Sequence, residues 1–149
     1  MSFDPHLYCA LHTGTPGDME FYGKIGCGKR ILELGGGDGR VTEAMVKSGA
    51  QVYALENHAG MLKLAEKRRA SLDEAHQEKW LIESGDMSRF DLKTRFDLVV
   101  IPYSGIFCLE AEARKHCFHL AAQHLQVGGS LVLDAYATEG LFDEPEEPS

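Results

Sequence analysis

The sequence lacks a long apolar run, a paired-cysteine motif and a secretion signal. None of its stretches approaches the roughly 20 consecutive apolar residues that a membrane-spanning helix needs. Its first residues, Met1–His6, have neither the basic flank nor the apolar core of a signal peptide. The four cysteines stand far apart, without the C-x-x-C spacing of zinc and dithiol sites: Cys9, Cys27, Cys108 and Cys117. We therefore expect a cytoplasmic protein with reduced thiols and no membrane partner.

Basic residues are scarce as well. The chain has 15 Lys and Arg against 23 Asp and Glu, a formal net charge of −8. Such a balance disfavours nucleic acid as a partner, because phosphates select basic surfaces. Part of the charge lies in Leu141–Ser149, which we expect to be a solvated acidic tail. The 149 residues suffice for one domain, with an N-terminal cap segment over 1–28 and the tail over 141–149.

Apolar strands alternate with amphipathic helices along the chain. The expected strands are Arg30–Leu34, Gln51–Leu55, Trp80–Glu83, Asp97–Ile101 and Ser130–Asp134. The expected helices are Asp18–Ile25, Val41–Lys47 capped by Gly49, Gly60–Gln77 with Ala75 on its inner face, and Leu109–Gln126 ended by Gly128-Gly129. This order predicts an α/β fold, a Rossmann-like doubly wound and mainly parallel sheet of about five strands flanked by helices.

A glycine-rich turn follows the first expected strand, in the segment Ile31–Arg40 (ILELGGGDGR). Glycines let the backbone turn sharply and lie close to a ligand. A nicotinamide-binding turn needs a third glycine where this chain has Arg40, and Glu33 would repel a pyrophosphate. The carboxylate of Glu33 instead suits a ligand that carries an ammonium and a sulfonium group.

Two further acids follow the next two strands. Glu56 ends the second strand 21 positions after Gly35 (56 − 35), where a carboxylate can accept both hydroxyls of a ribose. Asp86 follows the third strand, where it can accept from an adenine amino group. Together these acids indicate a cofactor that contains adenosine.

The chain resembles the class I S-adenosylmethionine (SAM)-dependent methyltransferases, specifically the small-molecule enzymes of the broad methyltransferase-domain family. The resemblance runs from about Tyr8 to Tyr136 and rests on five segments in the family's order: Glu33–Gly39, Glu56–Leu62, Gly85–Met87, Phe96–Tyr103 and Gln126–Leu133. It implies SAM as cofactor and S-adenosylhomocysteine as product. The residues it implies in cofactor binding are Glu33, Gly35, Gly37, Gly39, Glu56, Asn57, Met61, Asp86, Met87 and Pro102.

The N-terminal segment also resembles the part that folds over the cofactor in small-molecule members. Tyr8 and Tyr22 then contact cofactor or substrate. Alternatively, each is an aromatic side chain on a short amphipathic helix that simply packs against the rest of the protein. Both alternatives are open at this point.

The expected reaction is an in-line displacement, and its leaving thioether needs no acid. Positioning and water exclusion are then the main contributions of the protein. The sequence marks no residue as catalytic, and the candidates to orient a nucleophile are His12, Tyr103 and Ser104. Family members that methylate nucleic-acid bases carry Asn/Asp-Pro-Pro-Tyr after strand four, where this chain has Val100–Tyr103 (VIPY). We expect a small-molecule acceptor.

Three histidines, His116, His119 and His124, lie near the end of the last expected helix. Residues three apart share one helix face, which brings two of them together. No carboxylate-rich motif accompanies them, so we expect polar residues on a solvent-exposed face and no metal.

The family's sheet normally adds two antiparallel strands beside strand five, and this sequence has none after Ser130–Asp134. A SAM-binding module without activity of its own, a truncated methyltransferase, is therefore an alternative function. An NAD(P)-dependent oxidoreductase is a third. Strand five then becomes an exposed edge, which we expect to be closed by a homodimer or covered by the acidic tail.

Overall fold

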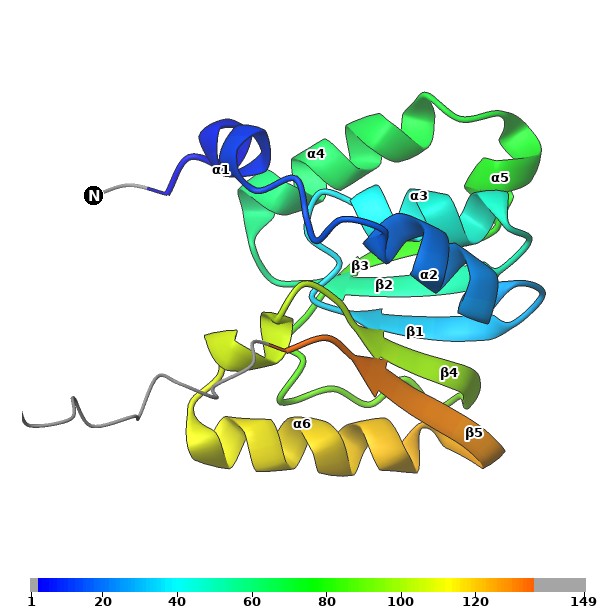
Figure 1. Cartoon of the computed structure of the whole chain (residues 1–149). Helices are drawn as coiled ribbons and strands as arrows, with labels where there is room; N and C mark the ends of the chain where they lie inside the picture. Colours follow the sequence, from blue (N-terminus) through cyan, green and yellow to red (C-terminus); the bar gives the residue numbers. More distant parts are fainter. Residues whose placement is uncertain (1–2, 136–149) are drawn as a thin grey trace, which may run out of the picture.

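Five parallel strands form the centre of the fold in the computed structural model, which describes residues 3–135 (Figure 1). Their order across the sheet is β3-β2-β1-β4-β5, and every neighbouring pair is parallel. The strands are β1 (Arg30–Leu34), β2 (Gln51–Glu56), β3 (Trp80–Ser84), β4 (Phe96–Ile101) and β5 (Leu125–Leu133). This confirms the predicted fold class. The order reverses between β1 and β4, where open α/β sheets form a crevice at the carboxyl ends of their strands.

Helices cover both faces of the sheet. The helices are α1 (Pro5–Leu11), α2 (Asp18–Gly26), α3 (Arg40–Lys47), α4 (Ala59–Ala70), α5 (Glu74–Glu78), the 3-10 helix η1 (Gly105–Cys108) and α6 (Ala111–Gln123). Figure 1 shows α2, α3 and α4 on one side of the sheet and α6 on the other. The part of the chain described in the structure includes no helix long and apolar enough to cross a membrane.

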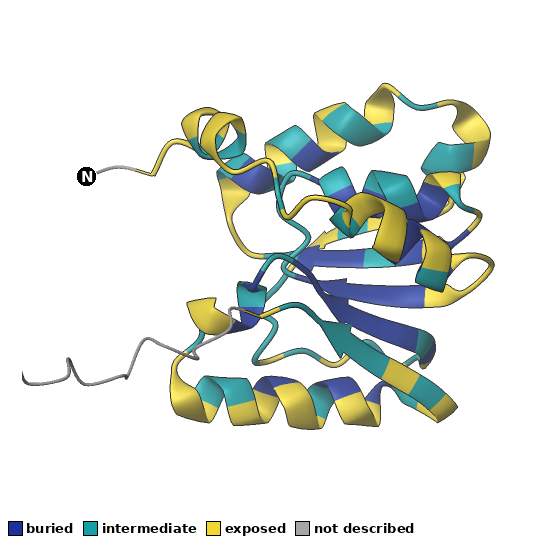
Figure 2. Cartoon of the chain, in the orientation of Figure 1, coloured by how far each residue is buried: buried dark blue, intermediate teal, exposed yellow. Residues whose placement is uncertain are grey.

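The core has two halves because neighbouring residues of a strand point to opposite faces. Ile31 packs with Met45 of α3 on one face, and Leu32 packs with Cys117 of α6 on the other. All four are completely buried. Burying one such aliphatic side chain stabilises a fold by about 1.5–3 kcal/mol. In Figure 2 the buried colour is therefore concentrated on the central strands.

The last strand is longer than predicted. β5 begins at Leu125, soon after α6 ends, so the predicted helix Leu109–Gln126 was too long at both ends. Gly128 and Gly129 lie inside β5, where the pairing with β4 shifts register between Phe96 and Leu98. Gly128 has a φ of +83°, which glycine adopts without strain, and the bulge leaves Val127 fully exposed.

The predicted helix Gly60–Gln77 is in fact two helices, α4 and α5. The chain leaves the helix at Ser71, and Asp73 starts the next one by accepting a hydrogen bond from His76 N at 2.9 Å. A short acidic side chain that caps a new helix competes with continuation of the old one. Ala75 consequently lies exposed, which corrects its predicted inward position.

His124 is buried, contrary to the prediction of a solvent-exposed polar face. Its Nε2 accepts from Leu92 N at 3.1 Å, so its Nδ1 donates to Leu120 O at 2.7 Å. The side chain thus joins the end of α6 to the segment before β4. His116 and His119 are exposed as expected. Among residues 3–135 no three His, Cys, Asp or Glu side chains are grouped to hold a metal ion.

Candidate functional site

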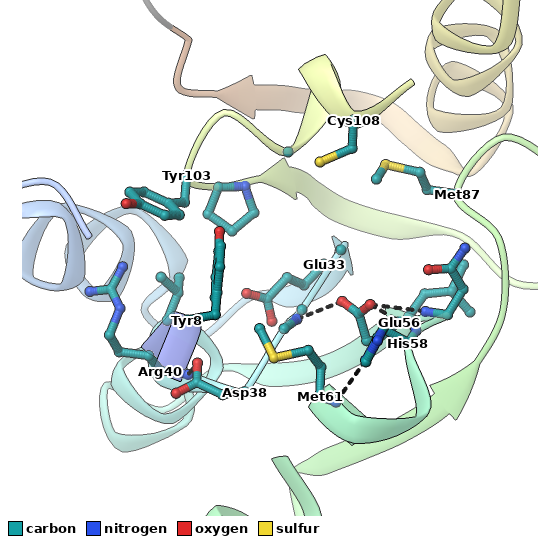
Figure 3. Close-up of a pocket in the computed structure, with 18 of the residues that line it drawn as sticks. Tyr8, Glu33, Asp38, Arg40, Glu56, His58, Met61, Met87, Tyr103 and Cys108 are labelled. Carbon is teal, nitrogen blue, oxygen red and sulfur yellow. Dashed lines mark hydrogen bonds between the residues drawn. The ribbon is translucent and has the colours of Figure 1, made fainter. Parts of the chain in front are cut away.

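A cavity of about 400 Å³ opens where the carboxyl ends of the strands meet (Figure 3). Its floor is made by the turn after β1 and the end of β2. The segments after β3 and β4 form two further walls, and residues of the N-terminal segment cover the opening. The cavity therefore lies at the reversal of strand order between β1 and β4, where the topology places a ligand site.

The glycine turn is fixed to the neighbouring strand. Gly35 N and Gly36 N both donate to Leu55 O, at 2.9 and 3.1 Å. Gly35 and Gly37 have φ values of +74° and +59° and line the cavity. A Cβ on Gly37 would lie 3.6 Å from the terminal methyl group of Met61. The turn thus needs glycine for its backbone conformation, and the missing side chains leave room in the cavity for a ligand.

Glu56 supports the turn from β2. Its Oε2 accepts from Gly37 N at 2.8 Å, and its Oε1 accepts from Asn57 N and His58 N at 3.1 and 3.0 Å. An ionised carboxylate offers about four acceptor positions. One therefore remains for a hydroxyl group inside the cavity.

Glu33 is the most unusual group of the site, since it is completely buried at 0% exposure. Its Oε2 accepts a short hydrogen bond from Thr42 Oγ1, and its Oε1 has no partner within the described residues. Desolvation raises the pKa of Glu33 to about 8, with the Glu56 charge adding to the rise and the Thr42 hydrogen bond opposing it. A buried oxygen without a partner is costly. Because Glu33 lines the cavity, a cationic donor bound there would satisfy it.

Asp86 and two methionines form the wall beyond Glu56. Asp86 Oδ1 accepts from Ser88 Oγ and Ser88 N at 2.7 and 2.8 Å, and these bonds lower the pKa of the carboxyl group. Met61 and Met87 add apolar surface on either side of the cavity (Figure 3). An ionised acceptor in the same wall as apolar methionine side chains suits an aromatic base that carries an amino group.

The cover of the cavity is aromatic. Asp4 caps α1 by accepting from His6 N at 2.9 Å, yet α1 contains no buried residue. Rings of the N-terminal segment make contacts at the opening, with centroids 4.5 Å apart for Phe3–His58, which joins the segment to the N-cap of α4, and 4.5 Å apart for Tyr8–His12, which lies within the segment. Ring contacts are thus one part of what holds the cover.

Two of the three candidates to orient a nucleophile come together. His12 Nδ1 lies 3.1 Å from Tyr103 OH, and both side chains line the cavity. Ser104 is buried at 8% exposure and does not line the cavity. Its hydroxyl group is therefore not placed to orient a ligand there, a correction to the prediction.

Most of the predicted cofactor residues share this one cavity. Its walls include Tyr8, Glu33, Gly35, Gly37, Glu56, Asn57, Met61, Asp86, Met87 and Pro102. Gly39 and Tyr22 lie elsewhere. A Cβ on Gly39 would meet the Trp80 ring at 2.4 Å, so this glycine serves packing. Tyr22 is 1% exposed in the core, where its hydroxyl donates to Asp134 Oδ1 at 2.7 Å.

Several lining residues were not predicted, and Arg40 is the clearest. Its guanidinium makes a bidentate pair with Asp18, with N–O distances of 2.8 and 2.5 Å, and this hydrogen-bonded pair lowers the pKa of the Asp18 carboxyl group. The positive charge in the cavity wall is therefore already neutralised. Asp38, also in the wall, is paired with Arg68 at 2.8 Å. No local sequence pattern signals pairs between residues 22 and 30 positions apart.

Comparisons with known proteins agree with this geometry. A family model described as "Methyltransferase domain" matches residues 31–129. The chain is 29% identical over 108 residues to a cypemycin N-terminal methyltransferase from Streptomyces sp, covering 72% of this chain and 42% of that protein.

Solved structures show the same likeness. The glycopeptide N-methyltransferase MtfA complexed with sinefungin superposes with a TM-score of 0.73 at 33% identity, covering 80% of this chain and 49% of that one. SAM-bound CalS10 from Micromonospora echinaspora, an amino pentose methyltransferase, also gives 0.73 over 92% of this chain and 58% of its own, and at 23% identity it shows the fold alone. The chain spans about half the length of the relatives just named.

Proposed function

The chain belongs to the methyltransferase-domain family, and we propose that it transfers the methyl group of SAM to an amine of a small molecule or peptide. The unpartnered Oε1 of the buried Glu33 carries this proposal. SAM presents an ammonium group on its amino-acid part, and an ammonium is the donor that a buried carboxylate needs. The bound cofactor supplies an electrophilic methyl group on a sulfonium.

The other walls fit the rest of the same cofactor. Glu56 keeps one acceptor position for a ribose hydroxyl, and Gly37 allows the backbone to approach the ribose. Asp86 would accept from the adenine amino group, with Met61 and Met87 packed against the base. The Glu56 carboxylate also opposes a pyrophosphate, while the one arginine in the wall is paired with Asp18. Charge therefore favours SAM over a nicotinamide dinucleotide.

The acceptor would bind at the outer end, beside His12 and Tyr103. An amine attacks only through an unprotonated nitrogen, and the imidazole or phenol oxygen of this pair can take a hydrogen bond from it. The aromatic rings of the cover would exclude water from the displacement. The names of two relatives, one an N-terminal methyltransferase and the other a glycopeptide N-methyltransferase, support an amine acceptor.

We further propose that the protein is cytoplasmic, in keeping with its four cysteines, which are all free. We expect no nucleic-acid partner, because the chain carries a net charge of −8.

A SAM-binding module without turnover is the second candidate function. It is favoured by the outer edge of β5, which pairs with no strand among residues 3–135. In such a module the cavity would bind cofactor without completing a site for an acceptor.

Two measurements separate these functions. Methyl-labelled SAM incubated with a panel of small amines and peptide N-termini should give a labelled product. Calorimetric titration should show S-adenosylhomocysteine binding more tightly than NADH. Binding without any labelled product favours the module, and tighter binding of NADH contradicts both methyltransferase functions.

We also propose that two protomers pair through the open edge of β5, which presents half-buried Leu131 and Leu133 beside unpaired backbone groups. The acidic tail 141–149 is the alternative cover, and it lies outside the described residues. Light scattering during gel filtration should report a dimer at tens of micromolar protein. A monomer at that concentration contradicts the pairing.

A further inference from the structure

One carboxylate oxygen next to the cavity joins three segments that are distant in sequence. Asp134 follows the end of β5 and does not line the cavity. Its Oδ1 accepts from Tyr22 OH in α2 at 2.7 Å and from Tyr103 N, in the loop after β4, at 2.5 Å. The bonds span 112 and 31 positions of the chain.

The hydrogen bond from Tyr103 N to Asp134 stabilises a strained backbone conformation in the loop after β4. Tyr103 and Ser104 both have a φ of +54°, and neither is a glycine. Left-handed backbone is strained in such residues and persists only where the surroundings impose it. The loop closes through Gly105 N, which donates to Pro102 O at 3.2 Å. Asp134 thus fixes the turn that presents the Tyr103 ring to the cavity and its hydroxyl to His12.

The Tyr22 bond connects the same oxygen to α2. Burial, together with the Asp134 carboxylate, raises the pKa of Tyr22, so its hydroxyl keeps its proton and acts as a donor. The N-terminal end of α2 is held separately by the Asp18–Arg40 pair. The helix that follows the N-terminal cover is therefore anchored at its first residue and at its middle to residues at or behind the cavity wall.

We propose that Asp134 is a positioning residue for methyl transfer. It holds Tyr103 in the conformation that places the phenol at the acceptor end of the cavity. Because Tyr22 donates to the same oxygen, that conformation is coupled to the docking of α2. The inference rests on the proposed function, since the acceptor end matters only if an acceptor binds there.

The experiment compares Asp134→Ala with Asp134→Asn, whose amide oxygen still accepts both hydrogen bonds. Tyr22→Phe removes one donor and leaves the Tyr103 bond. The control is Asp97→Asn, because Asp97 also accepts from a backbone amide, Arg30 N at 2.9 Å, but lies away from the cavity. For each variant we would measure kcat, KM for SAM, affinity for S-adenosylhomocysteine, and hydrogen exchange of the Tyr103 amide.

Asp134→Ala should lower kcat about tenfold or more, because a small displacement of a positioning group costs that much, and should leave KM for SAM within about threefold. The Tyr103 amide should exchange about tenfold faster. Asp134→Asn and Asp97→Asn should stay within about threefold of wild type in every readout, and Tyr22→Phe should fall between the two Asp134 variants.

Unchanged exchange at Tyr103 in Asp134→Ala overturns the inference. An equal loss of cofactor affinity and kcat overturns it too, as does failure of Asp134→Asn to retain activity. If Asp134→Ala does not fold, the other two variants decide. Loss of activity in Asp134→Asn, or unchanged exchange at Tyr103 in Tyr22→Phe, then overturns the inference. If wild-type protein binds S-adenosylhomocysteine but methylates no acceptor, the proposed function fails, and Tyr103 exchange still decides whether Asp134 holds the loop.

Discussion

The floor and the cover of the cavity differ in how they are held. Under the floor, Ile31, Leu32 and Leu34 of β1 are completely buried, and the glycine turn above them is hydrogen-bonded to β2. In the cover, α1 has no fully buried residue and leaves Leu7 and Leu11 57% and 69% exposed (Figure 2). Segments with few buried apolar contacts open at low cost in free energy. The floor is thus a preformed binding surface, and the cover is a weakly held closure.

The largest expected loss of ligand affinity comes from a substitution in the floor of the cavity, at Gly37. Gly37→Val adds a side chain at a φ of +59° and fills ligand space, so S-adenosylhomocysteine binding should weaken by about 3 kcal/mol or more. Gly128→Val is the matched control, because Gly128 has a φ of +83° but nothing within 4 Å of an added Cβ. Calorimetry should show lost binding in the first variant alone. Comparable losses in both would mean that backbone strain, and not the site, is responsible.

The next largest expected effect is a dependence of folding stability on pH that comes from Glu33. Its pKa is raised from 4.5 to about 8 on folding, so the folded state holds a proton that the unfolded state releases between these values. Stability should therefore fall as pH rises from about 4.5 to about 8, on the order of a few kcal/mol. Glu33→Gln should remove that fall, which urea unfolding at several pH values would measure.

The Glu33→Gln variant also tests whether Glu33 contacts the ammonium group of the ligand. S-adenosylhomocysteine should release close to one proton when it binds at pH 7, because its ammonium group favours ionised Glu33. Titrations in buffers of different ionisation enthalpy would detect this proton. Glu33→Gln should release none and bind roughly 1.5–3 kcal/mol more weakly, the range for a hydrogen bond to a charged group. Equal affinity in both proteins would exclude contact between Glu33 and the ammonium group.

Glu56→Ala and Asp86→Ala should each weaken S-adenosylhomocysteine binding by roughly 1–3 kcal/mol, because ligand donors lose their acceptors. Glu83→Ala removes an exposed acid of β3 outside the cavity wall and should leave binding unchanged. Circular dichroism would establish that all three variants fold. Normal affinity in folded Glu56→Ala would remove the assignment of the ribose site.

The smallest effect belongs to the cover. Phe3→Ala deletes a ring that contacts His58 and should weaken S-adenosylhomocysteine binding by about 0.5–1.5 kcal/mol, the contribution of an aromatic pair. The melting temperature of the free protein should not change, since Phe3 is 49% exposed and α1, which follows it, has no fully buried residue. Phe118→Ala, on the exposed face of α6, is the control. A lower melting temperature in Phe3→Ala would show that the cover is part of the stable fold.

The floor was predictable from sequence, and the reasons are local. Apolar runs marked the strands, and the residues just after them, such as Glu56 and Asp86, had to meet because carboxyl ends of parallel strands share one edge. Boundaries were less accurate where local signals compete. Asp73 began a second helix inside a helical pattern, and Gly128 produced a bulge inside a strand where it was expected to end a helix.

By itself, the sequence determined the parallel α/β sheet, the glycine turn and the set of acids around it, since each depends on spacing within one strand–turn–helix unit. Only the tertiary structure decided that Glu33 is buried with one oxygen unpaired, that Arg40 is neutralised by Asp18, and that Tyr22 reaches Asp134 and not the cavity. These contacts join residues 22 to 112 positions apart. Such partners are chosen by how helices pack across the sheet, and no periodicity in the chain records that choice.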